Sequence, residues 1–188
     1  MSHEIEVKLK LDVVALERGG IRLEIVLPRH FEENWLLDSV LRQLGEKSSI
    51  LRIRAVNGSG FLTYKARPGS DAPASQFKLR IEIETALGDP EKALDIFERL
   101  GFKKWFGYQK YRTVYRAILP DGSELHVMAD ETPLGNFLEL EGEENTILAA
   151  VKLLGLKPTD YILDSYLALQ LAHCQRQGKS LEDMEFRR

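Results

Sequence analysis

His3-Glu4-Ile5-Glu6-Val7-Lys8-Leu9, near the start of the chain, alternates charged and apolar side chains. A β-strand directs successive side chains to opposite faces, so Glu4, Glu6 and Lys8 share one face and the apolar residues share the other. Such a row of two acids and a base can hold a divalent cation at one end and a phosphate oxygen at the other. It can also be the solvated face of an ordinary strand, and the pattern in the rest of the chain separates the two interpretations.

The composition is that of one folded domain without disulfides. The chain has 188 residues, of which 44% are hydrophobic and 29% are charged, and its formal net charge is -3. This weak charge predicts no general affinity for nucleic acid or for acidic membranes. Cys174 is the only cysteine, which excludes an internal disulfide and a cysteine-rich zinc site. The acidic first residues and the lack of an apolar run of about 20 residues predict neither a secretory signal nor a membrane helix, so we expect a cytoplasmic protein.

Strand-like alternation continues through most of the chain. We expect strands at residues 3–11, 21–31, 49–56, 60–67, 76–86, 107–119, 123–131 and 136–142. We expect helices at residues 89–100, 144–154 and 160–177, with a weaker signal at 12–18. The segment 69–75 is rich in glycine, proline and serine, which is typical of a flexible loop.

These elements predict one domain over residues 1–175, followed by a charged tail over 176–188 that we expect to be loosely held. Eight antiparallel strands with few helices can bury one face and leave the other in water. They can also close into an eight-stranded barrel, and the question is then which face points inward.

Charged residues occupy one face of strand after strand. The acids are Glu4, Glu6, Glu82, Glu84, Asp130, Glu139 and Glu141. The bases are Lys8, Arg52, Arg54, Lys65, Arg80, Lys110 and Arg112. A single such strand is most simply a solvated face. Recurrence of the pattern on six later strands, with seven acids against seven bases, favours a closed barrel lined by ion pairs, because unpaired buried charges are costly.

The residue types indicate the chemistry of such a cavity. Several arginines and lysines suit a polyanion, since a guanidinium binds phosphate through two hydrogen bonds. Clustered carboxylates suit Mg²⁺ or Mn²⁺, which prefer oxygen ligands and often bridge to substrate phosphates. Together they predict a metal–polyphosphate site.

The order of the motifs resembles that of the CYTH superfamily, also called triphosphate tunnel metalloenzymes. The matching motifs are Glu4-x-Glu6-x-Lys8, Leu51-Arg52-x-Arg54, Thr63-x-Lys65, Arg80-x-Glu82-x-Glu84, Lys110-x-Arg112 with Tyr115, Asp130 before Leu134-Gly135-x-Phe137-x-Glu139-x-Glu141, and Ser165-Tyr166 with Leu167 and Leu169. The resemblance covers nearly the whole chain. Each motif is short, and it is the ordered set that is specific. Phe31-Glu32-x-Asn34 with Asp38 is also similar to the family, but we assign it no chemistry.

The resemblance implies a closed eight-stranded antiparallel β-barrel with flanking helices, of the α+β class, and a divalent metal, Mg²⁺ or Mn²⁺. It implies that the triphosphate is cradled by Lys8, Arg52, Arg54, Lys65, Arg80, Lys110 and Arg112. It implies that metal is ligated or oriented by Glu4, Glu6, Asp130, Glu139 and Glu141. Glu82 and Glu84 would hold a metal-bound water or fix neighbouring bases, so the expected catalytic set is Glu4, Glu6, Lys8, Glu82 and Glu84.

Three activities remain open at this point. Members of the family hydrolyse tripolyphosphate, thiamine triphosphate or nucleoside triphosphates, and others cyclise ATP to cyclic AMP. We favour hydrolysis because it needs only water and the tunnel, whereas cyclisation also needs a purine pocket and a positioned ribose hydroxyl. A non-catalytic polyphosphate-binding module is the second alternative. In each case the partner is a small triphosphate, with no nucleic acid and no membrane, and the protein is a monomer or a homodimer.

Overall fold

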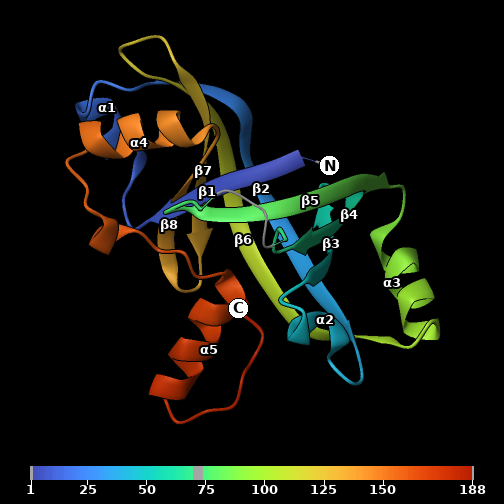
Figure 1. Cartoon of the computed structure of the whole chain (residues 1–188). Helices are drawn as coiled ribbons and strands as arrows, with labels where there is room; N and C mark the ends of the chain where they lie inside the picture. The colour runs from blue at the N-terminus through green and yellow to red at the C-terminus, as the bar shows by residue number, and fades with distance from the viewer. Residues whose placement is uncertain (1, 70–73, 188) are drawn as a thin grey trace.

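The structure, a computed structural model, describes residues 2–69 and 74–187, so part of the expected 69–75 loop lies outside the described residues. Its strands are β1 (Ser2–Leu9), β2 (Arg22–Ser39), β3 (Ile50–Val56), β4 (Ser59–Ala66), β5 (Lys78–Leu87), β6 (Phe102–Ile118), β7 (Glu124–Thr132) and β8 (Gly135–Glu141). They form a closed antiparallel barrel in the order β1-β5-β4-β3-β2-β6-β7-β8 (Figure 1). The expected barrel is confirmed.

The N-terminal strand β1 closes the barrel. It pairs with β5 on one side, where Glu6 lies opposite Lys78, and with β8 on the other, where Lys8 lies opposite Glu139. In a closed barrel one face of each strand points inward, and Glu6 and Lys8 on that face of β1 are buried. The charged row that opens the chain therefore lies in the interior.

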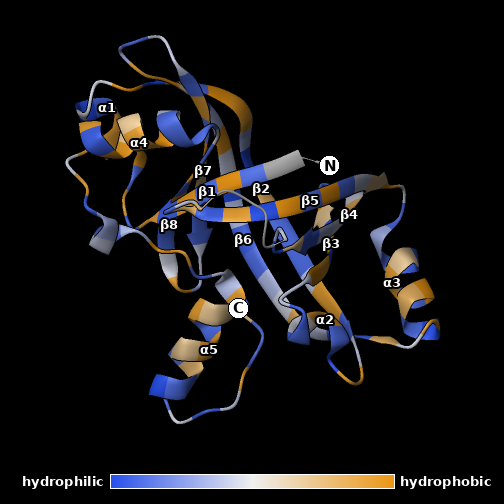
Figure 2. Ribbon diagram, viewed as in Figure 1, coloured by the Kyte–Doolittle hydropathy of each residue, from blue (hydrophilic) through white to orange (hydrophobic). Residues whose placement is uncertain are grey.

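Helices cover the outside of the barrel. They are α1 (Val13–Arg18), α2 (Gln43–Glu46), α3 (Pro90–Arg99), α4 (Glu144–Leu153) and α5 (Tyr166–Arg176), with a single 3-10 turn η1 (Pro158–Asp160). Val7 and Leu9 on the outer face of β1 belong to one buried apolar cluster with Leu16 of α1 and Ile147 of α4. The main apolar core is thus outside the barrel wall and the charges are inside, which is why the strands alternate between hydrophilic and hydrophobic residues in Figure 2.

Two strands are longer than the alternation predicts. β2 continues to Ser39 rather than ending near residue 31, and β6 begins at Phe102 rather than near residue 107. The two strands pair with each other from Arg22 opposite Ile118 to Ser39 opposite Phe102, with register shifts on the way. Bulges of this kind change the phase of the alternation, so a strict period of two does not reveal the whole strand.

The C-terminal region also differs from expectation. The helix expected over 160–177 begins only at Tyr166, because Ser165 caps it by accepting a hydrogen bond from the backbone N–H of Ala168. The tail expected to be loose is anchored to β6, since the backbone of Met184 bonds Gly107 O and Gln109 N at 2.9 Å each. The Met184 side chain is buried, and its backbone forms a strand-like bridge with Tyr108. These contacts hold the tail in place, although its many charged residues predict a solvated segment. No helix in the described ranges has the length and apolar character to cross a bilayer.

Candidate functional site

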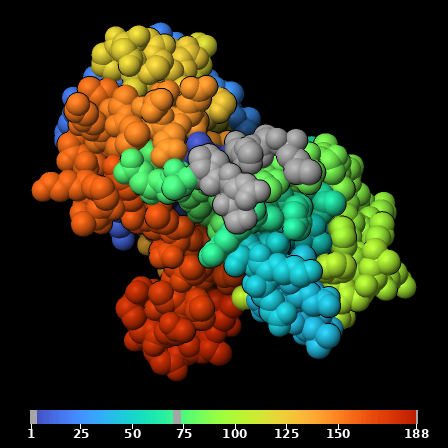
Figure 3. All heavy atoms as spheres, in the orientation of Figure 1, coloured from blue at the N-terminus to red at the C-terminus, as the bar shows by residue number. Residues whose placement is uncertain are grey.

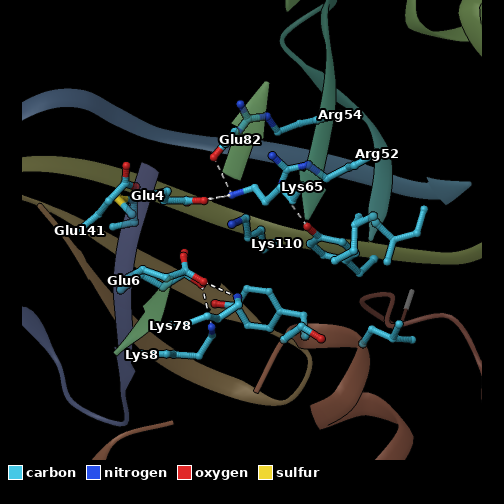
Figure 4. A pocket seen from close by; sticks show the side chains of 18 of the residues that line it. Glu4, Glu6, Lys8, Arg52, Arg54, Lys65, Lys78, Glu82, Lys110 and Glu141 are labelled. Carbon is cyan, nitrogen blue, oxygen red and sulfur yellow. Dashed lines mark hydrogen bonds and ion pairs between the residues drawn. The ribbon is translucent and has the colours of Figure 1, made fainter. Parts of the chain in front are cut away.

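The barrel encloses a cavity of about 520 Å³ that is lined mainly by charged side chains (Figure 4). The lining acids are Glu4, Glu6, Glu82, Glu84, Glu139 and Glu141. The lining bases are Lys8, Arg52, Arg54, Lys65, Lys78, Lys110 and Arg112. They come from β1, β3, β4, β5, β6 and β8, so the structure brings together motifs that lie far apart in the sequence.

The molecular surface is hollowed between α5, in red, and the segment around α2, in cyan (Figure 3). Ile50 at the start of β3 and Leu167 on α5 both line the charged cavity. Leu36 and Tyr108 add further apolar surface to the same lining. The cavity therefore has a charged interior with an apolar part near these residues.

Lys8 is one of the most enclosed cations of the cavity. Its Nζ lies 2.9 Å from Oε1 of Glu139 and 4.6 Å from the centre of the Tyr166 ring. Burial alone would lower the pKa of Lys8, but Glu139 and Glu6 outweigh burial and raise it above the ordinary value. Lys8 is therefore a fixed positive charge within the barrel.

Asp130 on β7 lies behind the lining residues and binds their cations. Its two oxygens accept hydrogen bonds from Nε and Nη2 of Arg112, each over 2.6 Å, and Oδ2 also receives Nζ of Lys110 over 3.0 Å. Arg112 also reaches Glu139. Burial opposes ionisation of Glu139, yet Lys8 and Arg112 hold its pKa well below the usual range. Asp130 and Glu139 are thus already engaged with fixed cations.

A second ion-pair network lies on β3, β4 and β5. Glu84 accepts hydrogen bonds from Nη2 of Arg54 over 3.0 Å and from Oγ1 of Thr63 over 2.6 Å. Arg52 donates to Thr63 and to the Tyr108 hydroxyl, over 3.2 and 3.3 Å. Two guanidinium groups are therefore held side by side, each with further N–H groups available to an anion.

Lys65 connects two of the acids. Its Nζ lies 2.6 Å from Oε2 of Glu4 and 2.9 Å from Oε2 of Glu82 (Figure 4). Burial raises the pKa of Glu4, and the neighbouring Glu82 carboxyl raises it further against the attraction of Lys65. The two carboxyl groups are therefore coupled by a hydrogen bond as well as by their charges, next to a shared cation.

Glu141 differs from the other lining acids. Within the described residues no ion pair or hydrogen bond engages its side chain. Burial, together with the charges of Glu4, Glu6 and Glu82, raises the pKa of Glu141 to about 7. A cation bound among these acids would relieve that repulsion.

Three acids, Glu4, Glu6 and Glu141, form what we call the acidic corner of the cavity, and their oxygens suit a hard divalent cation. Glu4, Glu6 and Glu141 offer carboxylate oxygens, the ligands that Mg²⁺ and Mn²⁺ prefer. Among the described side chains, however, no three of the types His, Cys, Asp and Glu are already arranged as a metal site. Mg²⁺ commonly needs only one or two carboxylates and completes its shell with water and substrate phosphates, so the residues fit the ion without forming a complete cage.

Most residues expected from the sequence meet at this cavity, with two differences. Arg80 is not among the lining residues, and Lys78, two positions earlier on β5, lines the cavity and pairs with Glu6. Asp130 lies behind the lining, as described above. Lys78 could have been predicted from the sequence, because alternate residues of a strand share one face and Lys78 lies two positions before the Arg80-x-Glu82 motif.

Residues on β2 also contribute to the site although the sequence assigned them no chemistry. The carboxylate of Glu32 lies 3.5 Å from Nζ of Lys110 and 3.7 Å from Nη1 of Arg54. Asn34 is fully buried, and neither polar atom of its side chain has a hydrogen-bond partner within the described residues. The similarity of Glu32-x-Asn34 to the family pattern is the feature of the sequence that could have identified these residues as part of the site.

Comparison with known proteins agrees with this arrangement. A family model described as "CYTH domain" matches residues 2–166. A protein of Methanocaldococcus jannaschii named "Putative adenylate cyclase" is 31% identical over 183 residues, which cover 89% of this chain and 98% of that protein.

Solved structures show the same architecture. A protein of Pyrococcus horikoshii is 28% identical, with a TM-score of 0.64 and coverage of 90% of this chain and 99% of that one. A protein of Hippeastrum, described as an adenylyl cyclase candidate with a dominant triphosphatase activity, is 21% identical, with a TM-score of 0.59 and coverage of 96% and 98%. This second likeness concerns the fold alone.

Proposed function

Because the chain belongs to the CYTH domain family, we propose that it is a divalent-metal-dependent hydrolase that cleaves the terminal phosphate from a triphosphate bound inside the barrel. The observation that carries the proposal is the composition of one cavity: seven cations and six carboxylates line it together. A site that only bound a polyanion would need the cations more than the acids. The acids are explained if a metal ion joins the phosphate.

The bases would bind the triphosphate. Lys8, Lys110 and Arg112 form one group, paired with Asp130 behind the lining and with Glu139 within it, and Arg52 and Arg54 form another around Glu84. Because these side chains are fixed by ion pairs before the substrate arrives, little reorganisation is needed when phosphate oxygens take their place among them. Phosphoryl transfer depends chiefly on such positioning and on neutralisation of charge.

Glu4, Glu6 and Glu141 would hold the divalent ion, which when bound neutralises phosphate charge and activates water. We assign Asp130 and Glu139 to the positioning of Arg112 and Lys110 or Lys8, because their oxygens are already bonded to those cations. Glu84 fixes Arg54 in the same way. Glu82, beside Lys65 at the edge of the acidic corner, would orient the attacking water.

Cyclisation of ATP is the second candidate. The observation in its favour is the name of the Methanocaldococcus jannaschii relative, which covers 89% of this chain. The apolar part of the cavity, with Leu36, Ile50 and Leu167, offers a surface for an organic group next to the phosphate-binding cations. Cyclisation would further require a group that places the ribose hydroxyl for attack on the α-phosphate.

A phosphate-release screen tests the proposal. Tripolyphosphate, thiamine triphosphate and ATP are each incubated with Mg²⁺ or Mn²⁺, and cyclic AMP is measured in parallel. We expect orthophosphate from at least one substrate, no turnover with excess EDTA, and loss of turnover in Glu4→Gln and Glu141→Gln. Glu17→Gln, on the exposed face of α1, is the matched control and should retain full activity.

The alternatives give different results in the same screen. Cyclic AMP and pyrophosphate as the main products from ATP would favour the cyclase. Tight binding of triphosphates by calorimetry with no turnover under any condition would favour a binding module. Full activity in both Glu4→Gln and Glu141→Gln would refute the proposed role of the acidic corner.

A further inference from the structure

A histidine lies buried beside the phosphate-binding cations, at a position for which the proposed mechanism has no use. His30 and Glu32 lie on the same face of β2, and their side chains are only 4% and 2% exposed. Lys110 on β6 is equally buried and faces Glu32. The three side chains form a chain from the barrel wall to the cavity, because Lys110 lines the cavity and the other two do not.

The hydrogen bonds of His30 define where its hydrogens lie. Nδ1 is 2.9 Å from the carbonyl oxygen of Pro28, and a carbonyl oxygen can only accept, so Nδ1 carries a hydrogen. Nε2 is 3.2 Å from Oε1 of Glu32. A carboxylate also only accepts, so Nε2 carries a hydrogen as well whenever Glu32 is ionised. The ring then bears a positive charge.

The surroundings of Glu32 keep it ionised. Lys110 and Arg54 lie within 3.7 Å of its oxygens. Burial works against ionisation of Glu32, but Lys110, Arg112, Arg54 and Arg52 outweigh burial and hold its pKa far below the usual range. A proton between His30 and Glu32 therefore belongs on the imidazole.

We propose that His30 is a buried imidazolium that acts as a positioning residue: it fixes the carboxylate of Glu32, which in turn fixes Lys110 and Arg54 in the phosphate-binding cavity. Glu32 receives hydrogen-bonded or ionic contact from His30 on its own strand, from Lys110 on β6 and from Arg54 on β3. Without His30, the carboxylate loses the contact that sets its orientation on the side away from the cavity.

The imidazolium also has a role in charge balance. When phosphate oxygens draw Lys110 and Arg54 towards the substrate, the two cations share their charge between the substrate and Glu32. His30 stays with Glu32 because it has no access to the cavity. A buried carboxylate that kept no cation would be costly, so His30 allows the other cations to turn towards the ligand.

Other charged groups face this pair and belong to the account. Arg112 lies opposite His30 on β6, and Asp130 on β7 binds both Arg112 and Lys110. Arg29, which precedes His30 on β2, forms an exposed ion pair with Glu131. None of these groups replaces the contact between Nε2 and Glu32, which is the only hydrogen bond to Oε1 of Glu32 within the described residues.

Nitrogen-15 NMR of the full chain tests the protonation of His30 without any ligand. At pH 7.5 we expect both ring nitrogens of His30 to carry hydrogen, because each of them faces an oxygen acceptor. His173, whose Nε2 bonds the side-chain amide of Gln177, provides an internal comparison in the same spectrum. A neutral His30 with one protonated nitrogen at pH 7.5 would overturn the proposal.

Calorimetry with tripolyphosphate tests the positioning role. We expect His30→Gln to weaken binding by roughly tenfold, on the scale of one charge-assisted hydrogen bond, and to change the pH profile of binding, because the variant has no imidazole ring. His173→Gln is the matched control and should bind as the wild type does. Equal affinity and equal pH dependence in His30→Gln and the wild type would overturn the positioning role.

This inference rests on the proposed function only for its ligand, and the two can fail separately. If tripolyphosphate does not bind the wild type at all, the proposed function fails, and the NMR result still decides whether His30 is charged. If the wild type binds and hydrolyses triphosphate but His30 is neutral, the inference fails alone.

Discussion

The hydroxyl of Tyr166 donates a hydrogen bond over 2.7 Å to Oδ2 of Asp130, which joins the first residue of α5 to the interior of the barrel. The same carboxylate binds Arg112 and Lys110. Asp130 thus connects the C-terminal helix to two of the cations that we assign to phosphate binding. Because Asp130 is almost fully buried, its loss would take a buried partner from both cations and leave Arg112 with Glu139 and Lys110 with the more distant Glu32.

Asp130→Ala should therefore lower the free energy of unfolding by about 3–5 kcal/mol, the cost of breaking a buried ion pair from one side. Tyr166→Phe removes one hydrogen bond only and should cost about 1 kcal/mol. Chemical denaturation measures both values. Asp95→Ala on the exposed face of α3 is the control and should change stability by less than about 0.5 kcal/mol. A cost for Asp130→Ala as small as that of the control would contradict the positioning role.

Lys78 and Arg80 separate the structural account from the sequence motif. Lys78 lines the cavity and pairs with Glu6, whereas Arg80 is not among the lining residues. We expect Lys78→Met to raise KM for the triphosphate by about tenfold and Arg80→Met to raise it by less than about threefold. Steady-state kinetics at fixed metal concentration gives both values. A larger effect at Arg80 would return that residue to the site.

Glu141 should make stability depend on pH in a defined direction. Its pKa is about 7 in the folded protein and about 4.3 in an unfolded chain. Between these values the folded state holds a proton that the unfolded state has released, so stability falls as pH rises through this window. Glu141→Gln removes the cost of ionising this carboxyl group in the folded protein. Without divalent metal, the variant should therefore be more stable than the wild type at pH 8 by about 1–3 kcal/mol, and its stability should be nearly equal to that of the wild type at pH 4.

Denaturation at the two pH values checks this expectation. Glu131→Gln is the matched control, because Arg29 lowers the pKa of Glu131 and the substitution should not stabilise the protein at pH 8. If Glu141→Gln were equally stable or less stable than the wild type at pH 8, the repulsion within the acidic corner would be refuted.

The anchored tail gives a further prediction. Met184 is 1% exposed and packs with Leu36, Phe106 and Tyr108, beside the cavity. Met184→Ala should cost about 2–5 kcal/mol of stability, as expected for a buried large-to-small substitution. Thermal or chemical unfolding measures the change, with the exposed Lys179→Ala as the control. An unaffected Met184→Ala variant would show that the tail does not contribute to the core.

The barrel could be predicted from the sequence because its period is local. Glu4, Glu6 and Lys8 alternate with apolar residues, and the same period recurs on strand after strand, so pattern and charge balance together indicate a closed interior. The ends of β2 and β6 could not be predicted this way, because bulges shift the phase and residues such as Glu32 and Asn34 are buried although polar. The alternation could not identify Met184 either. This residue lies in a charged tail, and its bridge partner Tyr108 is distant in the sequence and is brought next to it only by the fold.

The site was predictable at the level of residue type and less so at the level of role. Both Asp130 and Glu141 look like metal ligands in the sequence. In the structure Asp130 has cations on both oxygens, whereas no such partner engages Glu141 within the described residues. That difference depends on which strands are neighbours across the barrel, which one sequence does not reveal.

Product analysis in oxygen-18-labelled water distinguishes hydrolysis of the terminal phosphate from cyclisation. ATP and tripolyphosphate are each incubated with the protein and Mg²⁺ or Mn²⁺. The products are then separated, and their masses are measured by mass spectrometry. We expect the terminal phosphate to be released as orthophosphate carrying one labelled oxygen, and Glu4→Gln, although folded, to lose this reaction. Cyclic AMP with unlabelled pyrophosphate as the main products, or no consumption of any triphosphate, would contradict the proposed hydrolysis.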